Sequence, residues 1–429
     1  MRLGGRLAAA IEVLEDIALR RRPAADALKD WGLSHRFAGS GDRAAIGNIV
    51  YDALRRKRSA GWLFDAETPR ALGFGALLLQ WNLTPEGLNV ALEGDRFAPP
   101  PLSDDELHMA ATRRLEDAPA EIRADLPDWC APLFQDAFGA GWVEEAAGLS
   151  ARPPLDLRVN TLKAGRDRIL TELSGLGAAP TRLAPNGIRI PPIDGSGRHP
   201  NVQAEPAFQK GWFEVQDEGS QVVATLAGAA AGMQVLDYCA GAGGKTLALS
   251  AAMDNKGQIF AYDSEKQRLA PIFDRLRRSD NRNVQVVSKA AELHGLEGQM
   301  DIVLVDAPCT GSGTWRRRPD AKWRLAQKQL DVRIGEQTAI LDAAKSYVKP
   351  GGRLVYITCS VLPAVNAGQI DAFLAREPSF VPVDHQGLWG GHFPGREGLA
   401  MIDKDRGISL TPARSGTDGF YFAALQKQG

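Results

Sequence analysis

Long apolar runs, cysteines and grouped histidines are all scarce in this sequence of 429 residues. The longest apolar stretches, such as residues 71–79, are far shorter than the roughly 20 residues that span a bilayer. Met1–Gly5 leads into an amphipathic pattern and not into the apolar core of a signal peptide. Only four cysteines occur, in positions that do not suggest pairing, and His385 and His392 are isolated. We therefore predict a reduced, cytoplasmic protein without a membrane segment, a disulfide framework or a metal site.

Charge is nearly balanced overall but unevenly distributed. The formal net charge is −1, with +5 over residues 1–60, −11 over 61–150 and +5 over the remainder. A pI near 6.6 argues against bulk electrostatic capture of nucleic acid. Local basic clusters can still supply the phosphate contacts that dominate such affinity. The candidates are Arg20–Arg22, Arg55–Arg58 and Arg316–Arg318 with Lys322 and Arg324.

The first 150 residues show the apolar spacing of helices. Two stretches carry it, with apolar positions at Leu7, Ile11, Leu14 and Ala18 in the first and at Ile46, Ile49, Val50, Ala53 and Leu54 in the second. Asp42 stands where it could cap the second helix. Proline-rich breaks at 99–101 and 152–154 divide and close this region. We predict an all-helical domain over residues 1–150.

Two further domains follow in the sequence. Residues 151–212 predict a small α+β module, with strands at 155–159 and 187–190 and a helix at 166–176. Residues 213–429 alternate between strand and helix, which predicts a mostly parallel, doubly wound α/β sheet. The expected strands there are 233–237, 258–262, 284–287, 302–305, 354–358 and 420–425, with helices beginning near Glu265, Ala326 and Asn366.

Three of the four cysteines stand where expected strands end. Cys239, Cys309 and Cys359 each follow an apolar run. Because ligands bind outside the carboxyl ends of parallel strands, one sheet could place all three sulfurs along a single crevice.

The turn after the first of these strands is rich in glycine. It reads Cys239-Ala240-Gly241-Ala242-Gly243-Gly244-Lys245-Thr246. It fails the phosphate-loop motif, which needs glycine where Cys239 stands, and the dinucleotide motif, which needs glycine where Thr246 stands. Asp263 closes the next strand, where a carboxylate can accept hydrogen bonds from ribose hydroxyls. A nucleoside site without a phosphate cradle indicates S-adenosylmethionine, and the alternative interpretation is an ordinary tight turn.

The cysteines at 309 and 359 have a specific use beside a methyl donor. A single cysteine is more often inert packing, but here two lie at expected strand ends, one of them three residues after Asp306. The C5 carbon of cytosine becomes nucleophilic once a thiolate adds to C6. A nearby acid at N3 and the exocyclic amine would stabilise the developing charge. Removal of the C5 proton after methyl transfer would then expel the thiol.

Taken together, these motifs resemble the Nol/Nop/Sun family of RNA cytosine-5 methyltransferases, most closely its RsmB type. The resemblance covers nearly the whole chain and implies a Rossmann-like methyltransferase sheet, preceded by a small α+β module and a NusB-like, RNA-binding helical domain. The motifs that carry it are 237–246, 306–313, 317–323 and 356–363 with Asn366, together with the segments 211–221 and 418–422.

The resemblance implies a role for each matching residue. Cys359 would be the nucleophile, Cys309 would assist product release, and Asp306 would face the base. S-adenosylmethionine would be bound by the turn and two acids, namely Cys239, Ala240, Gly241, Ala242, Gly243, Gly244, Lys245, Asp263 and Asp306. Arg158 and Asn160 in the small module would contact RNA. Arg317, Arg318 and Lys322 are predicted RNA contacts because they belong to the basic cluster described above.

Two departures from the family pattern leave the RNA target open. The family usually has Ala-Pro where this chain has Gly241-Ala242, and an acid near the adenine where Ala290-Ala291 stand here, with Glu292 as a possible substitute. We predict a monomeric enzyme that methylates C5 of cytosine in structured RNA, with rRNA as the expected substrate. The alternatives are the same chemistry on tRNA, and a ribosome-assembly factor that binds RNA and cofactor without turnover.

Overall fold

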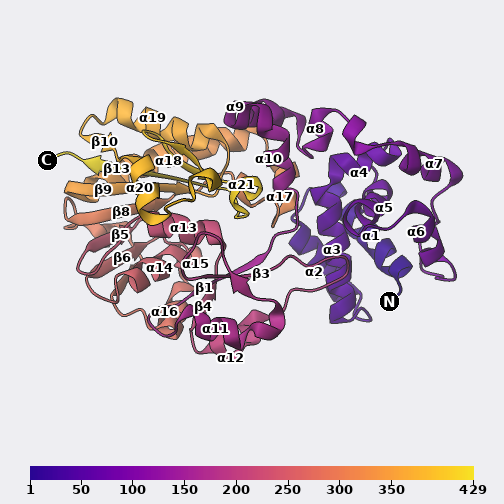
Figure 1. Ribbon diagram of the computed structural model, residues 1–429, viewed down its shortest axis with the longest axis horizontal. Helices are drawn as coiled ribbons and strands as arrows, with labels where there is room; N and C mark the ends of the chain where they lie inside the picture. Colours follow the sequence, from indigo (N-terminus) through magenta and orange to yellow (C-terminus); the bar gives the residue numbers. More distant parts are fainter. The chain divides into compact units, whose positions relative to one another are not determined.

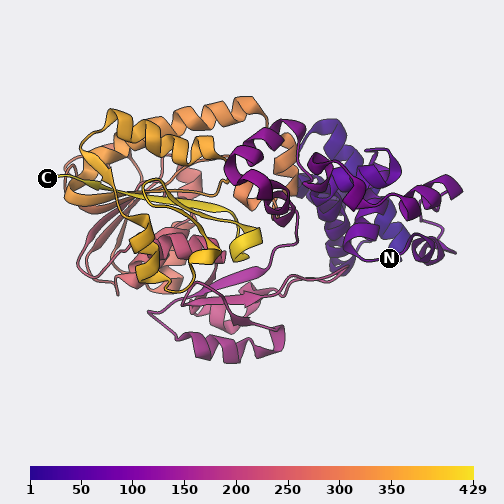
Figure 2. The same cartoon turned by 45° about the horizontal axis from the view of Figure 1, so that its top comes forward.

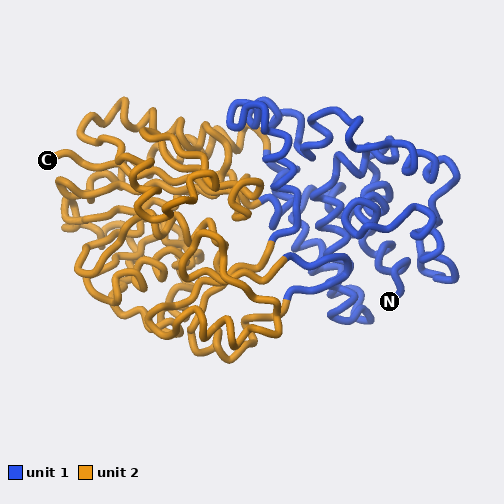
Figure 3. Tube along the Cα trace, viewed as in Figure 1, with its two compact units in different colours: residues 1–153, 192–199, 315–325 blue, residues 154–191, 200–314, 326–429 orange.

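The computed structural model describes residues 1–429, and the chain divides into two compact units. The helical unit consists of residues 1–153, 192–199 and 315–325 (Figure 3). The sheet unit consists of residues 154–191, 200–314 and 326–429. Two segments from later in the chain therefore fold with the N-terminal helices.

Residues 1–150 are helical, as predicted. The helices are α1 Leu3–Arg20, α2 Ala24–Ser34, α3 Ser40–Arg55, α4 Lys57–Phe64, α5 Pro69–Gln80, α6 Pro85–Leu92, α7 Asp104–Thr112, α8 Ala120–Arg123, α9 Ala131–Phe138 and α10 Trp142–Gly148, and the returning segment adds α17 Pro319–Arg324. A threonine N-cap followed by proline begins both α5 and α6: Thr68 accepts from the Ala71 amide and Thr84 from the Gly87 amide. None of the helices in the structure is long and apolar enough to cross a membrane.

The predicted apolar face of α3 is confirmed, since all five of its predicted apolar residues are buried. Two details were wrong. Ala18 is exposed because the last turn of α1 runs beyond the core. Asp42 does not cap α3, whose N-cap is Gly39. Asp42 lies in the first helical turn, where its Oδ1 accepts from the Arg6 Nε at 2.9 Å.

The returning segment 315–325 is anchored in the helical unit by its tryptophans. Trp315 is fully buried and stacks on Phe134, with ring centroids 6.0 Å apart. Trp323 donates its Nε1 hydrogen to the Leu54 carbonyl at 2.7 Å. Large aromatic rings bury much apolar surface, so this segment contributes to the core of the helical unit.

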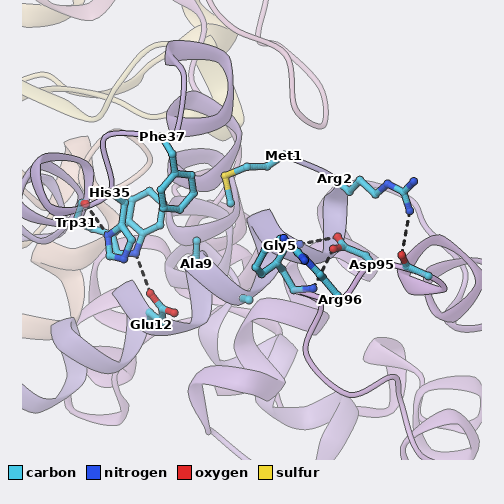
Figure 4. Close-up of a pocket in the computed structure, with 13 residues that line it drawn as sticks. Met1, Arg2, Gly5, Ala9, Glu12, Trp31, His35, Phe37, Asp95 and Arg96 are labelled. Atoms are coloured by element: carbon cyan, nitrogen blue, oxygen red, sulfur yellow. Dashed lines mark hydrogen bonds between the residues drawn. The ribbon is translucent and has the colours of Figure 1, made fainter.

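A cavity of about 640 Å³ is lined entirely by residues of the helical unit (Figure 4). Trp31 and His35 stack on one side of it, with ring centroids 4.3 Å apart. Glu12 accepts from the Trp31 Nε1 at 2.9 Å, and Asp95 accepts from the Gly5 amide at 3.0 Å. The cavity includes neither a cysteine nor any residue predicted to bind cofactor, so it is distinct from the predicted site.

The small sheet of the sheet unit has four antiparallel strands in the order β2-β3-β1-β4 (Figure 2). The strands are β1 Leu155–Val159, β2 Ala179–Pro180, β3 Gly187–Ile190 and β4 Phe213–Val215, with helices α11 Arg166–Glu172 and α12 Pro206–Gln209. The predicted strands at 155–159 and 187–190 have these bounds. Strand β4 pairs with β1 and so belongs to the small sheet, although it lies just beyond residue 212, the predicted end of the module.

The large sheet has the order β11-β12-β13-β9-β8-β5-β6-β7, and β10 pairs with β13. Strands β7, β6, β5, β8 and β9 are parallel, as predicted for a Rossmann-like sheet, whereas β13, β12, β11 and β10 are antiparallel additions. The strands are β5 Gln234–Asp237, β6 Gln258–Tyr262, β7 Val284–Val287, β8 Met300–Asp306, β9 Val348–Thr358, β10 Phe380–Pro382, β11 Met401–Asp403, β12 Gly407–Leu410 and β13 Phe420–Lys427.

Helices cover both faces of this sheet (Figure 1). Alternate residues of β8 and β9 point to opposite faces, which is the period of a strand. Ile302 and Leu304 pack with helices α13 (Glu218–Leu226) and α14 (Gly244–Ala252). Val303 and Val305 pack with helices α18 (Gln327–Ala344) and α19 (Ala367–Arg376). The other helices are α15 Lys266–Leu269, α16 Ile272–Ser279, α20 His385–His392 and α21 Pro412–Ser415.

A buried carboxylate holds the helical unit together. Asp52 of α3 is fully buried and accepts hydrogen bonds from Arg55 Nη1 at 2.9 Å, from Trp81 Nε1 at 2.9 Å and from Arg152 Nε at 3.0 Å. Replacing Asp52 with alanine should destabilise the protein by about 3–5 kcal/mol, because two largely buried guanidinium groups would lose their carboxylate. Thermal unfolding measures the effect.

Glu116→Ala is the matched control, because the side chains of Glu116 and its partner Arg114 are 74% and 72% exposed. Exposed ion pairs contribute little to stability, so the unfolding midpoint of this variant should stay close to that of the unmodified protein. Equal unfolding midpoints for the two variants would contradict the role given to Asp52.

Candidate active site

The sheet order brings the three cysteine motifs together. Strands β5, β8 and β9 are neighbours and run parallel, so the residues that follow them lie at one edge of the sheet. Cys239 follows β5, Cys309 follows β8 and Cys359 follows β9. The carboxyl ends of parallel strands are where α/β folds bind ligands.

The glycine-rich turn between β5 and α14 requires its glycines. Gly241 and Gly243 have φ values of +49° and +81°, which side-chain-bearing residues adopt only with strain. A Cβ on Gly243 would also lie 2.5 Å from the Ile272 Cγ1. Asp263 fixes the turn, because its Oδ2 accepts from the Gly241 amide at 2.9 Å while its Oδ1 accepts from the Glu265 amide at 2.9 Å. The turn therefore presents its backbone to a ligand in one defined conformation.

Acidic groups surround the start of α14. Lys245, in its first turn, donates to Asp306 Oδ2 at 2.6 Å. Asp237, at the end of β5, is buried and accepts from the Thr246 hydroxyl at 2.7 Å. Burial raises the pKa of Asp237 to about 7, against the lowering effect of that hydrogen bond. Asp237 and Thr246 were quoted within a sequence motif but were not predicted as site residues.

The two predicted reactive thiols are in direct contact. The Sγ atoms of Cys309 and Cys359 lie 3.4 Å apart. The contact with Cys359 lowers the pKa of Cys309, whereas the contact with Cys309, together with burial, raises the pKa of Cys359 well above its ordinary value. The two thiols are therefore coupled, and either sulfur can donate in this contact. The third thiol behaves differently, because burial raises the pKa of Cys239 and no hydrogen bond offsets it.

Hydroxyl groups lock the two cysteine loops to each other. Ser360 Oγ lies 2.9 Å from Thr310 Oγ1 and 3.0 Å from Ser312 Oγ. Ser312 Oγ also accepts from the Val361 amide at 3.0 Å, and the Gly313 amide donates to the Cys359 carbonyl at 3.0 Å. These groups are mostly buried, so the sulfur–sulfur distance is set by a fixed network. In the sequence, the only signal for this hydroxyl network is the serine and threonine content of the two cysteine motifs.

Three of the five residues predicted to contact RNA are buried. Arg158 is 6% exposed and donates its Nε hydrogen to Gln216 Oε1 at 2.6 Å. Asn160 is 2% exposed, and its Nδ2 donates to the carbonyls of Gly211 and Ser279. Lys322 is 1% exposed and donates to Ser150 Oγ at 3.1 Å. In this structure the three side chains bond within the protein, and their contact with RNA stays a prediction.

The other two predicted RNA contacts lie nearer the surface: Arg318 is exposed and Arg317 is half-buried. A further basic cluster, missed from the sequence, lies on the small-sheet module. The Arg168 guanidinium sits 3.9 Å from the centroid of the Trp212 ring and the Lys210 ammonium 4.8 Å from it. Arg168 and Lys210 are exposed, and arginine and lysine beside an aromatic ring form a common RNA-contacting combination. Their separation by more than 40 positions in the chain hid this cluster.

Comparison with known proteins identifies the family. Residues 224–426 match the family model described as 16S rRNA methyltransferase RsmB/F, and residues 126–192 match the ferredoxin-like domain of RsmF/B-like methyltransferases. The ribosomal RNA small subunit methyltransferase B of Citrobacter koseri is 33% identical over 318 residues, 73% of this chain and 69% of that protein. The corresponding protein of Photorhabdus laumondii is 33% identical over 307 residues, covering 70% and 66%.

The fold comparison agrees along the whole chain. The crystal structure of PH0851 superposes with a TM-score of 0.73 at 25% identity, covering 100% of this chain and 99% of that one. The chain thus belongs to the RsmB/F methyltransferase family, which confirms the resemblance found in the sequence. It is an RNA methyltransferase, and S-adenosylmethionine is its cofactor.

The residues at the sheet edge suit this cofactor. The glycine turn allows close backbone approach, and beyond Gly241 only Arg268 Nη2 and Asp263 Oδ2 lie within 4 Å of where a Cβ would stand. Asp263 and Asp306 offer carboxylates for hydroxyl and ammonium groups. No cluster of three or more potential metal ligands occurs in the structure.

Gly243→Ala should lower the affinity for S-adenosylmethionine by tenfold or more, because its backbone is left-handed and its Cβ would displace Ile272. Isothermal titration calorimetry measures this. Gly335→Ala, in the exposed middle of α18 with nothing within 4 Å of the added Cβ, is the control and should leave affinity unchanged. Equal affinities would show that the turn does not bind the cofactor in this conformation.

Proposed function

We propose that this member of the RsmB/F family transfers a methyl group from S-adenosylmethionine to C5 of cytosine in structured RNA, through a covalent bond between Cys359 and C6. The observation that carries the proposal is the pair of thiols 3.4 Å apart at the ends of β8 and β9, next to the cofactor turn. Methylation of an oxygen or an exocyclic nitrogen would need no sulfur, whereas C5 methylation needs a nucleophile at C6.

The chain's own residues account for each proton. As the target base binds, Cys359 gives up its proton to solvent and becomes a thiolate, with its sulfur 3.4 Å from that of Cys309. The Cys359 sulfur then bonds to C6, and the electron pair moves to C5, which takes the methyl group that the cofactor supplies. Cys309 releases its proton to solvent and accepts the proton from C5. The electrons of that C–H bond restore the ring double bond and expel Cys359 as a thiolate.

Asp306 would stabilise the charge that develops on the ring. Its Oδ2 is held by Lys245, and its side chain is one-third exposed toward solvent. We propose that the carboxylate of Asp306 would accept a hydrogen bond from the exocyclic amine of the base, while the ammonium group of Lys245 beside it would offset the negative charge that develops on the ring. Lys245 is 7% exposed and so keeps Asp306 in place.

The proposed RNA is small-subunit rRNA, because the curated relatives are named as ribosomal RNA small subunit methyltransferases. This chain spans about two thirds of the length of those relatives.

We place RNA contacts on Arg317 and Arg318 and on the cluster of Arg168, Lys210 and Trp212. The helical domain over residues 1–150 and the small module over 151–212 are proposed to dock RNA, and residues 213–429 to carry the chemistry. Bisulfite sequencing of RNA treated with the enzyme tests whether the product is 5-methylcytosine. With total RNA as the substrate, the sequenced positions show whether rRNA or tRNA is methylated.

Cys359→Ala should reduce methyl transfer by roughly 1,000-fold or more, because it removes the covalent nucleophile. Affinity for S-adenosylmethionine should stay nearly unchanged. Transfer of labelled methyl groups to RNA measures the rate. Cys130→Ala is the control, since Cys130 is buried in the helical unit, outside the thiol pair, and should retain activity. Activity of Cys359→Ala within tenfold of the unmodified enzyme would refute the assignment.

Cys309→Ala should trap the enzyme on its RNA. Without Cys309 the C5 proton stays in place, so the bond between Cys359 and C6 does not break. Denaturing electrophoresis should show a slow band that survives detergent and disappears in the double variant with Cys359→Ala. If Cys309→Ala releases methylated RNA at a normal rate, the second thiol has no part in elimination.

A further inference from the structure

Helix α16 joins the small sheet to the cofactor turn. It follows β6 and Asp263 in the chain, and its first residue, Ile272, packs against Gly243 of the turn. On the same helix, Arg275 donates from Nη1 to the Ala242 carbonyl at 2.8 Å. Two adjacent residues of the turn, Ala242 and Gly243, thus contact α16.

The other end of α16 is fastened to the small sheet. Asn160 donates to the Ser279 carbonyl at 2.7 Å, and Lys163 donates to the Arg278 carbonyl at 3.0 Å. Gly211 allows the close approach, because a Cβ there would lie 1.9 Å from the Arg278 carbonyl oxygen. The end of the helix and this loop therefore pack backbone against backbone.

Glu214 of β4 is the central polar link. It is 3% exposed, and its Oε2 accepts from Nε and Nη2 of Arg275 at 3.2 and 3.0 Å while its Oε1 accepts from Arg278. Arg275 therefore bridges a strand of the small sheet to a carbonyl of the cofactor turn. Ion pairs and charged hydrogen bonds with this little exposure are screened far less than surface pairs.

A second chain of hydrogen bonds runs parallel to the first. Arg158, opposite Glu214 in the β1–β4 pairing, donates to Gln216 Oε1 at 2.6 Å. Gln216 Nε2 donates to the Gly244 carbonyl at 3.3 Å and to the Ser220 hydroxyl at 3.1 Å. Two neighbouring carbonyls of the turn, those of residues 242 and 244, are thus hydrogen-bonded by side chains that the small sheet positions.

We infer that α16 and Gln216 couple RNA binding on the small sheet to cofactor binding at the turn, with Arg275 and Gln216 as positioning residues. The exposed cluster of Arg168, Lys210 and Trp212 gives the RNA side, because Trp212 directly precedes β4 and its carbonyl accepts from the Asn160 amide at 2.8 Å. RNA held there steadies β4 and α16 and thereby the turn. This inference rests on the proposed RNA substrate.

The coupling has a reciprocal signature. If RNA tightens cofactor binding by some factor, cofactor must tighten RNA binding by the same factor. S-adenosylhomocysteine is the probe for the turn because it permits no methyl transfer, and a small-subunit rRNA transcript is the probe for the small sheet. We expect each to tighten the other about fivefold or more in the full-length protein.

Arg275→Ala and Gln216→Ala should weaken S-adenosylhomocysteine binding several-fold without RNA and bring the coupling factor close to one. At saturating S-adenosylmethionine their kcat should stay within twofold, so that the loss appears in KM. Arg275→Lys keeps a donor and should recover part of the coupling. Arg277→Ala is the matched control, because Arg277 lies on the same helix, is 80% exposed and pairs only with Asp274.

Arg168→Ala combined with Lys210→Ala should weaken RNA binding and leave the affinity for S-adenosylhomocysteine alone unchanged. A coupling factor of one in the unmodified protein, or an unchanged factor in both Arg275→Ala and Gln216→Ala, overturns the inference. Thermal unfolding shows whether each variant is folded. If Arg275→Ala does not fold, Gln216→Ala still tests the inference. Failure of the proposed function is separate, since it would appear as an absence of 5-methylcytosine while coupling is still measured.

Discussion

The parallel pairing of β8 with β9 is the constraint on which the active site depends. In its register Asp306 lies opposite Ile357, so the loops with Cys309 and Cys359 leave the sheet side by side. The hydrogen bond from the Ala307 amide to the Ile357 carbonyl extends the pairing by one step, and the hydroxyl groups of Thr310, Ser312 and Ser360 continue it. A slip by one residue would turn the alternating side chains to the wrong faces and separate the sulfurs.

Much of this arrangement could be predicted, because its signals are local in the sequence. Apolar runs ended by cysteine or aspartate marked β5, β8 and β9, and strands at 258–262 and 284–287 have the bounds that their sequence indicated. The glycine turn was recognisable because positive φ values need glycine. The antiparallel addition of β10–β13 was less visible, because a single apolar run at 420–425 shows a strand without its direction.

Burial of charged side chains is the feature that the sequence did not show. Arg158 was predicted to contact RNA because of the family resemblance, and Lys322 because it stands in a basic cluster with Arg316–Arg318. Arg158 instead has Gln216 and the nearby charge of Glu214, and burial lowers its pKa to about 10. Lys322 lies in a returning segment that packs with the helical unit, and burial lowers its pKa to about 8. The residues that accept hydrogen bonds from Arg158 and Lys322 lie more than ten positions away from them in the sequence. The local sequence pattern therefore could not show that these two side chains are buried.

The residues of the candidate site lie in the sheet unit, whereas the segment that follows the Cys309 loop packs in the helical unit. Trp315 follows the Cys309 loop by only a few residues and yet belongs to the core of the helical unit. A chain lacking residues 1–150 would therefore expose Trp315 and leave Lys322 without Ser150. The sheet unit, in contrast, contains all the acids, glycines and thiols of the site within its own residues. Its small sheet reaches the glycine turn through α16, so the segment proposed to bind RNA and the segment proposed to bind the methyl donor contact the same helix.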